Sequence, residues 1–135
     1  MEYREFVQQV QSRAGITTFE QAEYAVITSL EMLGKRMGRD AAAHIAQQLP
    51  PELASYIIST EEPDLDIHDL NELLARVGKK ERAGYEAVES HVRAVIPVLV
   101  DAVTPAAMQR AIAGLPREMR IPFEKELAAE AQIPL

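Results

Sequence analysis

Histidine is the side chain that most often binds metals or moves protons near neutral pH. This 135-residue chain has three, His44, His68 and His91, which stand far apart in sequence. A di-iron bundle places a Glu three residues before such a His, but the residues at those positions here are Ala, Leu and Val. The His-Glu-x-x-His pattern of zinc proteases is also absent. The sequence therefore predicts no metal site, and it assigns none of the three histidines a role.

A stretch of alternating acids from Asp64 to Asp69 resembles the opening of a calcium loop. Such a loop also needs Gly at its sixth position and Glu at its twelfth, and these positions hold Asp69 and Ala75. We therefore interpret residues 61–66 as a solvated acidic linker. Asp66 or Asp69 is expected at the start of the next helix, where the helix dipole favours a carboxylate.

A basic loop from Gly78 to Gly84 contains Lys79 and Lys80. A phosphate-binding Walker loop has four residues between its glycines and ends in Gly-Lys-Ser/Thr. This loop has five, and Tyr85 follows it. Its bases could attract an anion, but we favour a solvated turn between two helices.

Nucleophilic catalysis has no recognisable motif in the chain. No serine lies in Gly-x-Ser-x-Gly, and the neighbours Ser90 and His91 would point in different directions on a helix. The pair Glu86 and Glu89 is typical of a solvated helix face. We expect His91, three residues after Val88, to lie at the border of an apolar face with a water or backbone partner. No catalytic or cofactor-binding residue is predicted, and no cofactor.

Composition narrows the class of protein further. With 14 basic and 21 acidic residues the net charge is −7, which disfavours binding to nucleic acid because that requires clustered cations. The chain has no Cys, so disulfides and thiolate metal sites are excluded. The longest apolar run, residues 94–100, is far shorter than the roughly 20 residues that span a bilayer. The first residues are charged and do not have the pattern of a signal peptide, so we expect none. We expect a cytoplasmic protein that binds neither nucleic acid nor membrane.

The helices expected to position the residues discussed above belong to a sequence motif that occurs twice, at an offset of 66 residues. Apolar residues recur at helical spacing in both copies. The two sets are Phe19, Ala22, Val26, Leu30, Leu33 and Met37, and Tyr85, Val88, Val92, Ile96, Leu99 and Val103. The following segments match as well, and both reach a Leu-Pro pair, at Leu49-Pro50 and Leu115-Pro116. Each copy opens with a shorter amphipathic helix, containing residues 3–10 in the first copy and 67–77 in the second.

Helix boundaries agree with this division. Thr17 and Glu20 predict a capping box before the first long helix, and Asp40 is a plausible cap for the helix after it. Thr104-Pro105 predicts a helix start in the second copy. Pro97 interrupts the second long helix, and the apolar run around it is also compatible with a strand; we favour a helix because the periodicity is helical.

A Phe near the N-terminus, a long Ala-rich helix, and a Leu-Pro followed by a short helix, all given twice, resemble the bacterial family catalogued as domain of unknown function 2267. The matching positions include Phe6, Phe19, Ala22 and the two Leu-Pro pairs, and the resemblance covers residues 3–127. It implies an all-helical bacterial cytoplasmic protein with no established activity, so no catalytic residue is carried over.

We therefore expect one all-α domain over residues 1–135, with eight helices. They would form two tandem repeats, 1–60 and 67–130, that share one core and are joined by the acidic linker 61–66. The preferred function is a non-enzymatic protein-interaction or scaffold module, with an unknown protein partner or self-association. The alternative is a small-molecule-binding protein or enzyme that uses a groove between the repeats. A pocket at the junction with a buried carboxylate or histidine would favour the alternative.

Overall fold

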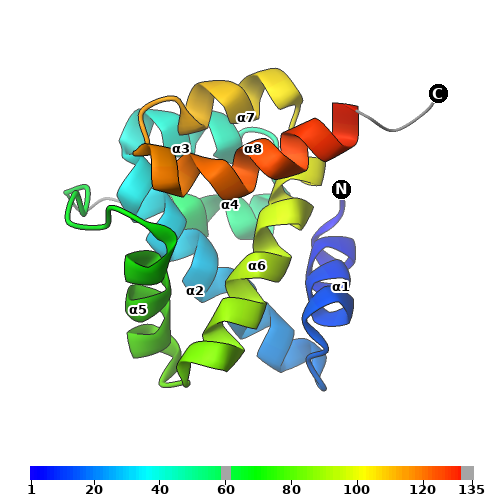
Figure 1. The fold of residues 1–135 in the computed structure, drawn as a ribbon. Coiled ribbons are helices and arrows are strands. Elements are labelled where there is room, and N and C mark those ends of the chain that lie inside the picture. The colour runs from blue at the N-terminus through cyan, green and yellow to red at the C-terminus, as the bar shows by residue number, and fades with distance from the viewer. Residues whose placement is uncertain (59–61, 132–135) are drawn as a thin grey trace.

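The structure is a computed structural model that describes residues 1–58 and 62–131, and every regular element within these ranges is an α-helix (Figure 1). This confirms the expected all-α fold. The eight helices are α1 (Tyr3–Ala14), α2 (Phe19–Met37), α3 (Arg39–Ala46), α4 (Pro51–Ile57), α5 (Leu70–Glu81), α6 (Tyr85–Ala102), α7 (Pro105–Ile112) and α8 (Arg117–Ala131).

The two long helices α2 and α6 form the centre of the molecule and pack against each other. Helices α1 and α5 each contact both of them, α3 packs on α7, and α4 and α8 lie against α2 and α6 respectively. The α1–α2 and α5–α6 turns lie at the lower end of the view, and α3 and α7 at the upper end (Figure 1). At the upper end the backbone N–H of Thr104 donates to Gln48 Oε1 over 2.7 Å.

The core of the molecule is apolar and includes residues from all eight helices. Its largest fully buried side chains are Phe6, Phe123, Leu30, Leu33, Ile45, Leu53, Ile57, Ile67, Leu73, Leu74, Leu99 and Met108. Burying one such aliphatic side chain stabilises the fold by roughly 1.5–3 kcal/mol. Most positions of the two predicted periodic sets are buried; the exceptions are Phe19 and Met37, which are half-buried, and Tyr85, which is exposed. The helical spacing therefore correctly predicted the buried faces of α2 and α6.

The predicted helix boundaries are right in most cases and wrong by a few residues in others. Thr104 caps α7 by accepting the N–H of Ala107, as predicted. The first capping box lies one residue later than predicted, at Thr18 with Gln21. Helix α3 begins directly after Gly38, whose φ is +91°, so Asp40 lies within the first turn and is not the cap.

Helix α6 continues through Pro97, which excludes the strand alternative. Pro97 is buried, and it lines a cavity of about 210 Å³ between α6 and α8 together with Pro122, the proline inside α8. Neither proline has a backbone N–H, so each removes one hydrogen bond from the interior of its helix. The helix persists because its apolar face is buried over most of its length.

Helices α2 and α4 approach each other closely at one glycine. A Cβ added at Gly34 would overlap the carbonyl oxygen of Ile57 and crowd the backbone around it. The residue 66 positions later is Val100, so the second long helix does not need this glycine. The close approach is therefore a specific constraint on α4.

Gly34→Ala is expected to destabilise the protein by about 3 kcal/mol or more, because the new methyl group meets rigid backbone and not a flexible side chain. The measurement is urea unfolding followed by circular dichroism. Gly114→Ala is the control, since a Cβ there meets nothing within 4 Å, and it should change stability by less than about 0.5 kcal/mol. Equal costs for the two variants would contradict the close approach of α2 and α4.

Candidate functional site

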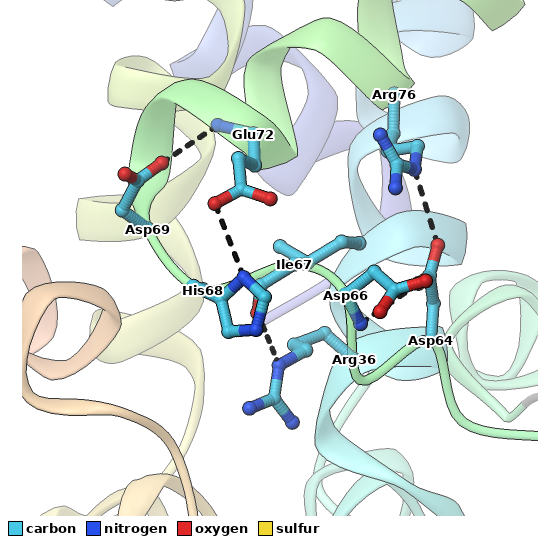
Figure 2. Close-up of polar contacts among 8 residues, drawn as sticks. All are labelled: Arg36, Asp64, Asp66, Ile67, His68, Asp69, Glu72 and Arg76. Carbon is cyan, nitrogen blue, oxygen red and sulfur yellow. Dashed lines mark hydrogen bonds and ion pairs between the residues drawn. The ribbon is translucent and has the colours of Figure 1, made fainter.

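The acidic segment before α5 is held against neighbouring helices (Figure 2). The backbone N–H of Asp64 donates to the carbonyl of Lys35, and its carboxylate accepts from Arg76 Nε over 3.1 Å. Arg36, which is 8% exposed, donates from Nε to the carbonyl of Ile67 over 2.6 Å. The expectation of a solvated linker is therefore wrong for Asp64, although Asp66 is exposed. Residue 61 lies outside the described part of the chain.

Helix α5 begins where one of the two predicted acids stands. Asp69 is its N-cap and accepts the N–H of Glu72 over 2.8 Å, whereas Asp66 lies before it. His68 is exposed and contacts Glu72 at 3.3 Å (Figure 2). Within residues 1–58 and 62–131, no three His, Asp or Glu side chains are grouped in a way that could hold a metal ion.

A larger hollow, open to solvent and of about 680 Å³, lies where the α1–α2 turn meets the α5–α6 turn. We call it the junction pocket. It is lined by Ala14, Gly15, Ile16, Thr17, Glu20, Gln21, Tyr24, Glu81, Ala83, Ala87, Ser90 and His91. His91 is the one histidine among them; His44 is exposed on α3. The pocket thus combines residues 14–24 from the first half of the chain with residues 81–91 from the second.

Three side chains from three helices form a hydrogen-bonded cluster beside this pocket. Glu81 is the last residue of α5, and its side chain is only 4% exposed. Its Oε2 lies 2.8 Å from Nδ1 of His91 on α6, and its Oε1 lies 2.8 Å from the hydroxyl of Thr28 on α2, the shortest of the three acceptor contacts of that hydroxyl. Both carboxylate oxygens therefore have a partner, as a buried charge requires.

This arrangement fixes which nitrogen of His91 carries the proton. An ionised carboxylate can only accept hydrogen bonds, so Nδ1 of His91 donates and Nε2 is left with its lone pair when the ring is neutral. The side chain of His91 is 20% exposed and lines the pocket. The cluster can thus present a hydrogen-bond acceptor of fixed orientation to a molecule in the pocket.

Two sequence-based predictions need correction at this site. Helix α5 extends through Gly78 to Glu81, so the predicted 78–84 loop is in fact the short turn 82–84. Arg82 ends the helix with a left-handed φ of +56°. His91 also has a carboxylate partner and not the backbone or water partner expected. The apolar spacing of α5 could have indicated Glu81, which lies four residues after the buried Val77.

A second cavity, of about 550 Å³, lies between α7 and α8. Its charged lining residues are Arg120 and Glu124, which pair with each other at 3.1 Å. These charges are partly exposed and already matched, so they give a ligand less to bind than the buried cluster of the junction pocket does. We therefore take the junction pocket as the candidate site.

A double-mutant cycle measures the strength of the contact between Glu81 and His91. Replacing each by Ala, singly and together, is expected to give a coupling free energy of about 1.5–3 kcal/mol, because the hydrogen bond involves a buried charge. The same cycle on the partly exposed pair Arg120 and Glu124 should give less than about 0.5 kcal/mol. Similar small values for both pairs, obtained by urea unfolding, would refute the buried contact.

The pKa of Asp64 gives a test of the linker contact. Burial opposes ionisation of this carboxyl, but the hydrogen bonds from Arg76 and the Asp66 backbone, with the charges of Arg76 and Lys35, together outweigh it, so its pKa lies below the ordinary 3.8. A lowered pKa stabilises the folded state above pH 3.8 and loses that effect as the pH falls further.

Wild type should therefore be more stable than Asp64→Asn at pH 6, by at most about 1 kcal/mol since Arg76 is partly exposed. The advantage should shrink as the pH falls below 3.8. An advantage independent of pH, in urea unfolding from pH 6 to pH 2.5, would show that the charge of Asp64 is not involved.

No helix in residues 1–58 or 62–131 is long and apolar enough to cross a membrane. A comparison with curated protein sequences gives no significant match. A comparison with protein-family models matches residues 3–121 to a family described as an uncharacterized conserved protein, DUF2267. This match covers most of the chain and agrees with the resemblance seen in its sequence, so the chain belongs to the DUF2267 family.

Proposed function

We propose that the protein binds a small molecule in the junction pocket, and that it does so in the cytoplasm of a bacterium. The observation that carries the proposal is the buried Glu81, which holds His91 against the wall of a hollow of about 680 Å³. Cavities of roughly 300–1,000 Å³ with apolar walls and a few fixed polar groups are typical of ligand sites. Ile16, Ala83 and Ala87 supply apolar wall here.

The position of Glu81 supports a role beyond stability. The carboxylate is buried and lies at the C-terminal end of α5, where the helix dipole disfavours a negative charge. Buried ion pairs are often no more stabilising than apolar residues of the same volume. Apolar residues could therefore join the three helices at least as stably as this cluster does. Orientation of His91 toward a ligand explains why a buried carboxylate stands there instead.

We also propose that the chain consists of two tandem four-helix repeats, α1–α4 and α5–α8, that share one core. The contacts between helices support this, because α1 packs on α6 as α5 packs on α2, and α2 packs on α4 as α6 packs on α8. In this arrangement the α1–α2 and α5–α6 turns are equivalent. The junction pocket would then lie where the two copies of this turn meet.

A protein-interaction module, the function favoured by the sequence, is a second candidate. Tyr56, Ile58 and Leu65 are large apolar side chains that are 38%, 41% and 64% exposed, and exposed apolar groups can mark a docking surface. The junction pocket is the better supported site, because its polar groups are arranged in a defined geometry.

Ligand binding can be tested by native mass spectrometry after incubation with a small-molecule extract of bacterial cells. Wild type is expected to retain an added mass. Ala87→Phe should lose it, because the new ring fills the pocket from α6. Ala106→Phe, at an exposed position on α7 away from the pocket, is the matched control and should keep it. Absence of a retained molecule, or equal retention by Ala87→Phe, would contradict the proposal.

A further inference from the structure

His91 and Glu20 bring hydrogen-bond acceptors to the junction pocket. His91 offers Nε2, since its Nδ1 is engaged by Glu81. Glu20, which is exposed in the first turn of α2, adds a carboxylate. The last turns of α1 and α5 also end at the pocket, where the carbonyls of Ala14 and Lys80 already accept hydrogen bonds from the hydroxyls of Ser90 and Tyr24.

The carboxylates that line the pocket come from both halves of the chain. Glu20 and Glu81 are both acidic, and no lysine or arginine is found among its described lining residues. The base that stands just before Glu81, Lys80, directs its Nζ to Glu31 over 3.2 Å. The C-terminal ends of α1 and α5 add partial negative charge, and the N-terminal ends of α2 and α6 add partial positive charge. At the N-terminal end of α2, the side chain of Thr18 accepts the N–H of Gln21, and Glu20 lies in the first turn.

A pocket with two acidic lining residues and a histidine acceptor favours a ligand that donates hydrogen bonds and carries positive charge. We propose that the ligand of the junction pocket is a protonated amine with a short apolar body. Its ammonium group would donate to Nε2 of His91 and lie close to the carboxylate of Glu20, and its apolar part would contact Ile16 and Ala87. This inference rests on the proposed function and adds the chemical class of the ligand.

The test uses three probes of one shape and different charge: n-butylammonium, n-butanol and butyrate. Each is titrated into ¹⁵N-labelled protein, and the dissociation constant is taken from the shifts of the Gly15 and Ala83 amides, which lie in the pocket lining. Butylammonium is expected to bind about tenfold more tightly than butyrate, with butanol between them. The preference should weaken as salt is added.

Two matched variants identify the carboxylate responsible. Glu20→Gln should weaken butylammonium binding by about three- to fivefold, a modest effect because the ion pair between the ammonium group and Glu20 is exposed to solvent. It should leave butanol binding unchanged. Glu86→Gln is the control: Glu86 is 66 residues later, also exposed, in the first turn of α6, and outside the pocket lining. It should leave all three probes unchanged.

The outcomes separate this inference from the proposed function. Butanol or butyrate binding as tightly as butylammonium, or a Glu20→Gln variant that binds butylammonium normally, would overturn the choice of an amine. If none of the probes shifts the pocket amides while wild type still retains a molecule in native mass spectrometry, the amine is again wrong but the proposed function holds. Failure of both experiments would reject the pocket as a ligand site.

Discussion

The hydrogen bonds of the Glu81 carboxylate are the interaction on which the arrangement of the site depends. Its two oxygens accept from side chains of two other helices, Thr28 on α2 and His91 on α6. A buried carboxylate without such partners would be strongly unfavourable. Helices α2, α5 and α6 must therefore keep one register relative to each other, and this register places the α1–α2 and α5–α6 turns on either side of the pocket.

Much of the fold could be predicted from the sequence, because it depends on periodic apolar positions. Leu30, Leu33, Val92 and Leu99 occur at helical spacing, and all four are buried in α2 and α6. Pro97 did not prevent the correct assignment of α6, because the apolar face continues on both sides of it. A rule based on spacing works where packing of one helix face is the main cause of the structure.

The site could not be predicted in the same way, because it depends on contacts between distant parts of the chain. Gly78 was interpreted as the start of a loop, yet it lies inside α5; a Cβ there would lie 3.4 Å from the carbonyl oxygen of Ala83 and from a methyl group of Val88. Because the predicted helix ended before Gly78, the prediction placed Glu81 in a solvated turn. Thr28 gave no signal, since its partner lies 53 residues away. Asp64 was missed similarly, because its partner Arg76 lies 12 residues later in the chain.

The central claim is that Glu81 holds His91 with its proton on Nδ1 and Nε2 free toward the pocket. The most direct measurement is the two-bond ¹H–¹⁵N correlation spectrum of the His91 ring at alkaline pH, which distinguishes the two tautomers by their nitrogen shifts. The structure predicts a protonated Nδ1 and a bare Nε2, a state lost in Glu81→Ala. A proton on Nε2 in the wild-type protein, or a ring that averages between the tautomers as in free histidine, would contradict the account.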